Sequence, residues 1–381
     1  MSVKLNKIKP FTVHVEQSIL DDMKARIRNT RWTDEIIGSG WSNGTNLGYL
    51  KELAAYWVHE FDWRKLEAEI KFYPNFLAEI NGHTIHFMHI RGKGKVSVPL
   101  VITHGWPGSF LEMMKLIPLL TSNENFSFDL VIPSIMGFGF SEKITEPGCN
   151  SIFVADLWLQ LMKELGYKKF GAQGGDIGAG ISAWLALRYP ENILGLHLNF
   201  IPGSYSPYTK EGEPLVPGME EYLKKRNQWI MEEGAYSQLH RTKPISLAHG
   251  LNDSPIGLCS WIIEKFHTWS DNKGHIENSF TKDELLGNIT LYWVTQTIHS
   301  SIRIYKENAS APMKFGKDDF VRVPVAFANF IKEISAPPRP WIEKGFNILH
   351  WTDMAEGGHF AALEQPRLLA DDIIDFFKSI T

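Results

Sequence analysis

Residues 168–183 read KKFGAQGGDIGAGISA, with Asp176 at the centre of the pattern Gly174-x-Asp176-x-Gly178. The residues before Asp176 predict a strand, and those after it predict a helix. Glycines two positions before and after the central residue are typical of a sharp strand-to-helix turn, because a Cβ atom there would clash across the turn. The stretch therefore predicts a nucleophile elbow in an α/β fold.

An aspartate at the centre of this turn favours a particular chemistry. A carboxylate can attack a saturated carbon and leave an ester, whereas a serine in the same turn is suited to acyl transfer. Asp176 therefore points away from esterases and proteases, and toward enzymes that open epoxides or displace halide.

Composition and charge are those of an ordinary globular protein. The 381 residues are 44% hydrophobic and carry a net charge of −4, so no basic field for nucleic acid or anionic lipid is evident. Cys149 and Cys259 suggest a reduced compartment. Residues 1–18 lack the apolar core of a signal peptide, and no run of about 18 apolar residues predicts a membrane span. We expect a cytoplasmic protein with no nucleic-acid or membrane partner.

Strand and helix signals alternate in two parts of the chain, which predicts a mostly parallel sheet flanked by helices. A helical block interrupts this alternation, as an inserted cap would. We therefore expect an α/β-hydrolase fold in four segments. These are an N-terminal extension or helical meander over residues 1–95, a first core part over 96–201, a helical cap over 202–314 and a second core part over 315–381.

Several individual elements are also expected. Ser18 is a candidate cap for the first helix, and Asn81-Gly82 predicts a hairpin. The longer helices expected after the first are Asn46–Glu60, Phe110–Leu120, Asp156–Gly166, Met219–Glu233, Ile256–Trp269, Thr281–Tyr305 and Gln365–Ile380.

Two further residues complete a candidate set of nucleophile, acid and base. His359 follows an expected strand in a glycine-rich loop that frees the backbone to place the imidazole. A carboxylate on its other ring nitrogen would fix the tautomer and stabilise the imidazolium. Glu333 follows the preceding strand and fits this role. Asp353, Glu356 and Glu364 are competing acids, but the first two lie on the histidine's own loop and the third favours the start of the final helix.

The loop His104–Ser109 follows a strand at the position where α/β-hydrolases carry an oxyanion-hole loop. In such a loop a backbone N–H group pairs with that of the residue after the nucleophile. The expected donors are the N–H groups of Trp106 and Ile177. This set of groups needs no metal ion and no organic cofactor.

Taken in order, the motifs resemble those of the microsomal-type epoxide hydrolases, α/β-hydrolases with an N-terminal extension and a helical cap. The likeness runs nearly end to end. The residues that carry it are Trp57, Phe61-Asp62-Trp63-Arg64, His104–Ser109, Gly137-Phe138-Gly139-Phe140-Ser141, Gly174-Gly175-Asp176, Leu251–Leu258, Ile304–Asn308 and Gly357–Pro366.

The resemblance implies Asp176 as the nucleophile, His359 as the base and Glu333 as the acid. It also implies that two cap tyrosines, Tyr305 and Tyr236, hold the epoxide oxygen. Tyr305 matches the family motif well, whereas Tyr236 is placed only by its spacing to a following Thr-Lys-Pro sequence.

Two departures from the family pattern affect the expected pocket. Ile177 stands where the family often has tryptophan, and Met136 replaces a usual proline. Trp106, Ile177 and Phe360 are the expected substrate-binding residues, in a wide apolar pocket between cap and sheet.

The expected activity is conversion of a small apolar epoxide and water to a vicinal diol through a covalent aspartyl ester, with detoxification as the expected role. One alternative is a haloalkane or haloacid dehalogenase, although Ile177 offers no side-chain donor to a halide and two tyrosines suit an alkoxide better. The other is a non-catalytic relative that binds a ligand. The oligomeric state stays open, with a homodimer as one option.

Overall fold

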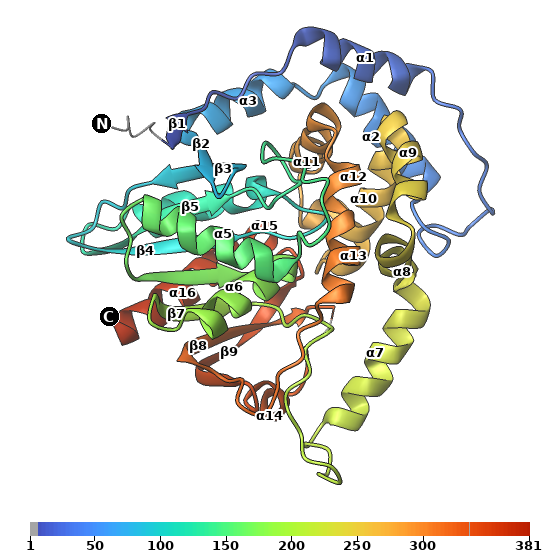
Figure 1. Ribbon diagram of the computed structural model, residues 1–381. Helices are drawn as coiled ribbons and strands as arrows, with labels where there is room; N and C mark the ends of the chain where they lie inside the picture. The colour runs from blue at the N-terminus through green and yellow to red at the C-terminus, as the bar shows by residue number, and fades with distance from the viewer. Residues whose placement is uncertain (1–6, 335) are drawn as a thin grey trace.

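The computed structural model describes residues 7–334 and 336–381, and these residues form a nine-stranded sheet at the centre of the molecule (Figure 1). The first six residues, part of the segment expected to lack a signal peptide, lie outside the described residues. The strands are β1 (Ile8–Pro10), β2 (Asn75–Ile80), β3 (His83–Ile90), β4 (Val96–Thr103), β5 (Phe126–Pro133), β6 (Phe170–Gly174), β7 (Ile193–Leu198), β8 (Val321–Lys332) and β9 (Phe346–Gly358).

The strand order is β1-β2-β3-β5-β4-β6-β7-β8-β9. Strands β1 to β3 pair antiparallel with one another, and β3 pairs antiparallel with β5. From β5 to β9 all neighbouring strands are parallel, so their carboxyl ends meet at one edge of the sheet. The expected mostly parallel sheet is confirmed.

Helices pack on the parallel strands and form the outer layers (Figure 1). Helix α5 (Ser151–Glu164) packs against α6 (Asp176–Arg188), and α16 (Pro366–Ile380) packs against α4 (Leu116–Thr121). The expected helix over Phe110–Leu120 is divided, because a 3-10 turn η1 (Phe110–Lys115) precedes α4. The short helices α14 (Arg339–Ile342) and α15 (Ala361–Glu364) complete this part of the fold. The chain has the α/β-hydrolase fold.

The N-terminal segment contributes three helices and three strands of the sheet. Helices α1 (Gln17–Arg28), α2 (Leu47–His59) and α3 (Trp63–Phe72) precede β2. The side chains of Asn46 and Asp62 cap α2 and α3, and the expected start of a helix at Asn46 is confirmed.

The expected cap at Ser18 is wrong, because Glu16 is the N-cap residue of α1. The expected hairpin at Asn81-Gly82 is confirmed, with both residues at positive φ between β2 and β3. Strands β1 to β3 share one sheet with the later strands, so the domain boundary expected at residue 95 divides a continuous sheet.

The helical block after β7 lies along one side of the sheet (Figure 1). Its elements are α7 (Met219–Glu233), α8 (Ala235–Thr242), α9 (Pro244–Asp253), α10 (Pro255–Trp269), η2 (Ile276–Asn278), α11 (Lys282–Thr295), α12 (Ile298–Ser301) and α13 (Arg303–Ser310).

The single helix expected over Thr281–Tyr305 is wrong. Gln296 adopts a left-handed conformation with φ 51° and ends α11, so α12 and α13 take new directions. Helix α8 ends just before Lys243 and α9 begins just after it. Neither helix was expected from the sequence.

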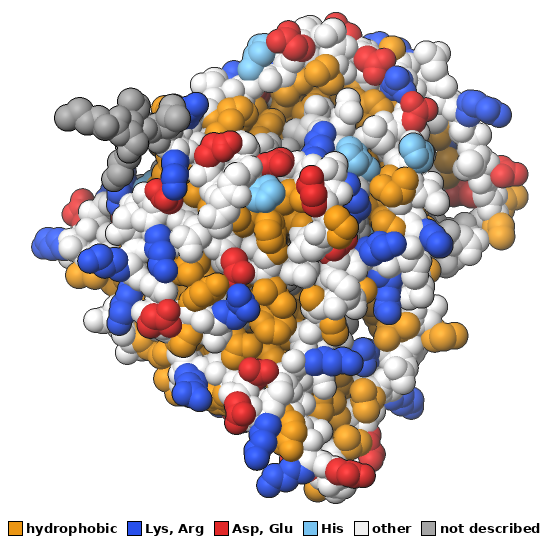
Figure 2. Space-filling view, viewed as in Figure 1, with side chains coloured by type: hydrophobic (Ala, Val, Ile, Leu, Met, Phe, Trp, Pro, Cys, Tyr) orange, Lys and Arg blue, Asp and Glu red, His pale blue; other side chains and the backbone are white. Residues whose placement is uncertain are grey.

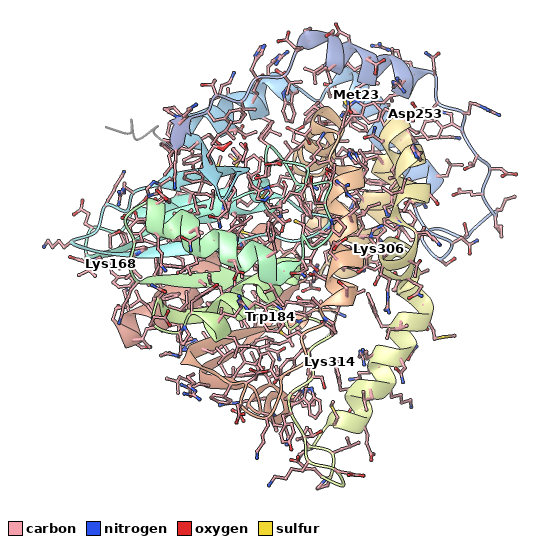
Figure 3. All side chains as sticks on the ribbon, in the orientation of Figure 1. Met23, Lys168, Trp184, Asp253, Lys306 and Lys314 are labelled. Atoms are coloured by element: carbon pink, nitrogen blue, oxygen red, sulfur yellow. The ribbon has the colours of Figure 1, made fainter. Side chains whose placement is uncertain are left out.

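Polar contacts attach the helical block to the rest of the molecule. Arg26 of α1 forms an ion pair at 2.8 Å with Asp253 at the end of α9. Asp253 is labelled in Figure 3. From α11, Asn288 Nδ2 donates to the Pro107 carbonyl at 2.8 Å and the Tyr292 hydroxyl donates to the Gly108 carbonyl at 2.7 Å. Helix α11 therefore holds the loop in which the oxyanion-hole donor is expected.

The molecular surface carries both signs of charge. Lys and Arg side chains are interspersed with Asp and Glu on the face shown in Figure 2, in keeping with the small net charge. Over residues 7–334 and 336–381, no helix combines the length and apolar character that a membrane crossing requires.

A buried polar network lies between α16 and the strands β7 and β9. Asp372 accepts hydrogen bonds from His197 at 2.9 Å, His350 at 2.7 Å and Thr352 at 2.5 Å. Burial raises the pKa of Asp372, but these hydrogen bonds and the charge of His197 outweigh burial and hold its pKa below the ordinary value of 3.8.

We expect Asp372→Ala to lower the free energy of unfolding at pH 7 by about 3 kcal/mol, because the substitution leaves buried donors without an acceptor. The pKa of Asp372 is lower in the folded than in the unfolded protein, so its ionised form stabilises the fold at pH values above the unfolded-state pKa. This stabilisation is lost as the pH falls through the pKa of the folded state. The deficit of the variant should therefore shrink as the pH falls below about 4. Urea unfolding measures both effects, with Asp371→Ala at the neighbouring exposed position as the control. Equal stability of the two variants at pH 7 would contradict this account.

Candidate active site

Asp176 lies in a strained turn at the carboxyl end of β6. Strand β6 ends at Gly174 and α6 begins at Asp176, which has a φ of 47°. A Cβ atom on Gly174 would overlap the backbone of Gly178, and one on Gly178 would overlap the carbonyl of Thr103. Both glycines are therefore required for the close approach of strand and helix, as the sequence pattern predicts.

The other two members of the predicted set follow neighbouring strands. Glu333 comes directly after β8, and His359 comes directly after β9. His359 Nε2 lies 3.4 Å from Asp176 Oδ2, and His359 Nδ1 lies 2.7 Å from Glu333 Oε1. The Glu333 side chain is only 1% exposed. The structure therefore brings Asp176, His359 and Glu333 into one line of contacts.

The two carboxylates control the charge of His359. Burial lowers the pKa of His359, but the charge of Glu333 and the contact with Asp176 outweigh it and raise the pKa well above the ordinary value of 6.5. The resting site thus favours an imidazolium held between two carboxylates.

The competing acids lie elsewhere. Asp353 accepts hydrogen bonds from Asn329 and Trp351. Glu364 is bound to the backbone N–H groups of Asp271 and Phe360, at 2.7 Å and 2.9 Å. Neither acid reaches the ring of His359, and Glu333 does.

The loop after β4 supplies a backbone donor to Asp176. The N–H group of Trp106 donates to Asp176 Oδ1 at 2.8 Å. Gly105 packs so closely that a Cβ atom would overlap the Asp176 side chain. Ile177 follows Asp176 in the first turn of α6, but among the hydrogen bonds of the described residues its N–H group makes none to Asp176.

The two predicted tyrosines lie above Asp176, on helices α8 and α13. The Tyr236 ring stacks on Trp106 with centroids 5.4 Å apart, and the Tyr305 ring meets Trp106 edge-on at 5.8 Å. Lys306, the residue after Tyr305, marks the place of α13 in Figure 3. Burial is the largest cause that raises the pKa of both hydroxyls, and nearby negative groups that include Asp176 raise it further. Both hydroxyls therefore stay protonated and can donate hydrogen bonds.

The cavity at Asp176 is smaller than the wide apolar pocket expected. Its volume is about 20 Å³, and Trp106, Phe360, Asp176 and His359 are among its lining residues. Aromatic side chains of the cap fill the space above it. The expected substrate-binding residue Ile177 is half-buried and is not part of this lining.

Three residues of this region were not predicted from the sequence. Trp269 packs edge-on against His359 at 5.2 Å, and fully buried His240 packs against Trp106 at 4.7 Å. Glu112 is a buried carboxyl group in the lining of the cavity. Only Glu112 has a local signal, the pattern Ser109-x-x-Glu112, and that pattern is typical of a helix cap rather than of a catalytic group.

Within the described part of the chain, no group of three or more His, Cys, Asp or Glu side chains has an arrangement that could hold a metal ion. The chemistry assembled at the carboxyl edge is that of a carboxylate nucleophile, a histidine with its acid, a backbone donor and two phenol donors.

Comparison with known proteins assigns the family. The model of the epoxide hydrolase N terminus matches residues 8–113, and the model of the alpha/beta hydrolase fold matches residues 98–254. The chain is 37% identical over 405 aligned positions to epoxide hydrolase 1 of Sus scrofa, covering 97% of this chain and 88% of that protein. It is 35% identical to juvenile hormone epoxide hydrolase 1 of Ctenocephalides felis, covering 97% and 86%.

A solved structure agrees with this assignment. The crystal structure of juvenile hormone epoxide hydrolase from the silkworm Bombyx mori superposes with a TM-score of 0.88 at 30% identity, covering 98% of this chain and 94% of that chain. Because these likenesses extend over nearly the whole chain, the chain belongs to the epoxide hydrolase family of α/β-hydrolases.

Proposed function

We propose that this epoxide hydrolase converts a small apolar epoxide to a vicinal diol in two steps that share Asp176. The observation that carries the proposal is the line of contacts from Asp176 Oδ2 through His359 to Glu333, with two cap tyrosines packed on Trp106 beside it. A carboxylate nucleophile, a histidine base and two phenol donors together match the needs of ring opening followed by ester hydrolysis.

In the first step, Asp176 Oδ2 attacks one carbon of the epoxide. The Trp106 N–H group occupies Oδ1, so Oδ2 is the oxygen left to act as nucleophile. The bond between that carbon and the ring oxygen breaks, and Tyr236 and Tyr305 donate hydrogen bonds and one proton to the oxygen as it gains charge. Their raised pKa values keep both phenols protonated until then.

In the second step, water hydrolyses the ester at Asp176 Cγ. Formation of the ester removes the charge of Asp176, one of the groups that raise the pKa of His359. The pKa of His359 therefore falls, and the neutral imidazole, the form that can accept a proton from water, is favoured. The oxyanion develops on Oδ1, where the N–H group of Trp106 already lies and that of Ile177 can join it.

The protons balance over the cycle. One proton of the water passes through His359 to the leaving alcohol oxygen. The other is released as the Asp176 carboxylate forms again, and it restores the imidazolium of the resting site, whose own proton passes to the tyrosinate after ring opening. Glu333 stays ionised throughout and stabilises the imidazolium.

The narrow aromatic space above Asp176 favours a small or slender apolar substrate. A cytoplasmic location, a role in detoxification and a homodimer stay predictions from the sequence.

The nucleophile is tested with a panel of epoxides and alkyl halides, with diol and free halide measured separately. We expect wild type to form diol, and Asp176→Ala to lose about 1,000-fold or more of that rate because no ester can form. The control is Asp353→Ala. It removes an acid that makes no contact with the ring of His359, so this variant should retain its activity. Halide release without diol from wild type would contradict the proposed reaction, and diol formation by Asp176→Ala would contradict the proposed nucleophile.

The tyrosines are tested in single-turnover fluorescence measurements of ring opening. We expect Tyr305→Phe and Tyr236→Phe each to slow this step by about 100-fold, because each substitution removes a donor to the developing alkoxide. The matched control is Tyr205→Phe. It removes the hydroxyl of a side chain as buried as Tyr236, which donates to the carbonyls of Trp341 and Ile342 in another part of the molecule. Ring opening at the wild-type rate in both test variants would exclude the tyrosines from the reaction.

A further inference from the structure

The active-site cavity contains a second buried carboxyl group that the reaction described above does not use. Glu112 is the third residue of the 3-10 turn η1, which follows the loop that carries Trp106. Glu112 lines the same small cavity as Asp176 and His359. A buried carboxyl group lowers the stability of the folded protein unless neighbouring groups form hydrogen bonds with it. Such groups beside a nucleophile and its base are often functional.

One oxygen of Glu112 is bound by the protein. Glu112 Oε1 accepts a hydrogen bond from the Ser109 N–H group at 3.0 Å. The carboxyl group packs directly on Gly108, where a Cβ atom would overlap it. The carbonyl of Gly108 is in turn held by the Tyr292 hydroxyl of α11. These contacts fix the carboxyl group in place. They supply a hydrogen-bond donor to Oε1 only, and among the hydrogen bonds of the described residues no protein group donates to Oε2.

The cavity has the size that a water molecule needs. Its volume of about 20 Å³ compares with the roughly 10–15 Å³ required for one water. Polar groups on several sides are the second requirement, and Glu112, His359 and Asp176 supply them. The cavity therefore suits a single water molecule in contact with the base and the nucleophile.

We propose that Glu112 positions the hydrolytic water, a role that rests on the function proposed above. The water donates one hydrogen to His359 Nε2 and the other to Glu112 Oε2. With both hydrogens held, the oxygen lone pair is directed toward Asp176 Cγ. Glu112 thus acts in ester hydrolysis, and ring opening proceeds without it.

The neighbouring charged groups also act on Glu112. Burial raises the pKa of Glu112 to about 8, the charge of His359 opposes the shift, and the charge of Asp176 adds to it. Whether protonated or ionised, the carboxyl group retains acceptor capacity for a hydrogen of the water. Glu364 also faces this group and raises its pKa, and it is unchanged by ester formation.

A purely structural role is the competing explanation. Ser109 and Glu112 form a capping box, in which Glu112 accepts from the Ser109 N–H group and the Ser109 hydroxyl accepts from the first turn of η1. A structural role predicts lower stability and similar losses in both chemical steps. A positioning role predicts a loss confined to hydrolysis.

The test is Glu112→Gln, which keeps the size of the side chain and an oxygen for the Ser109 N–H group but replaces the free oxygen with a donor. Ring opening and ester hydrolysis are measured separately, by stopped-flow fluorescence and rapid quench, in single turnovers of styrene oxide. We expect hydrolysis to slow about 10-fold or more, and ring opening to change by less than about 2-fold. The ester should accumulate, so kcat falls more than kcat/KM.

Two further variants separate the explanations. Ser109→Ala removes the cap hydroxyl but keeps the N–H group that binds Glu112. We expect lower thermal stability without the selective loss of ester hydrolysis expected for Glu112→Gln. Glu112→Asp keeps the carboxyl group but withdraws it from the cavity, and we expect slow hydrolysis again.

Three outcomes would overturn the proposal. They are hydrolysis at the wild-type rate in Glu112→Gln, equal losses in both steps, and failure of both Glu112 variants to fold, which would assign the residue a structural role. If wild type itself forms diol without an ester intermediate, the function proposed for Asp176 fails instead, and the two failures are thereby distinguished.

Discussion

The turn at Asp176 is the constraint on which the rest of the site depends. A φ of 47° is unfavourable for a residue with a side chain, and it persists because Gly174, Gly178 and Gly105 let neighbouring backbone approach without a clash. This close packing places one carboxylate oxygen on the Trp106 N–H group and leaves the other facing His359. The two carboxylate oxygens of Asp176 therefore have different environments before any substrate binds. The backbone geometry thus determines which oxygen acts as the nucleophile and which later carries the charge of the oxyanion.

Electrostatic coupling then connects the two chemical steps. In the resting state the charge of Asp176 raises the pKa of both His359 and Glu112. Once Asp176 is an ester, that contribution disappears for both groups together. The imidazolium of His359 then loses its proton more easily, and the neutral ring can accept a proton from water. A single change of charge at the nucleophile thus prepares the site for hydrolysis, with no movement of the backbone required.

The sequence predicts the parts of this site that depend on local patterns. The glycines around Asp176 predict its turn, and the places of Glu333 and His359 after strands predict that they meet at the carboxyl edge of a parallel sheet. The end of α11 at Gln296 is not predictable in this way, because a left-handed residue other than glycine carries no clear signal. The role of Glu112 is hidden for a different reason. Its pattern with Ser109 is satisfied by a helix cap, and only the folded chain reveals the cavity that it shares with His359.

The central claim is that Asp176 becomes part of the intermediate, and the source of the diol oxygen tests it most directly. A single turnover is run in water labelled with heavy oxygen, with enzyme in excess over epoxide, and the diol is analysed by mass spectrometry. The account predicts that the first diol carries unlabelled oxygen from Asp176 and that the label enters the carboxylate of the enzyme instead. Labelled oxygen in that first diol would mean direct attack by water on the epoxide, and it would contradict the account.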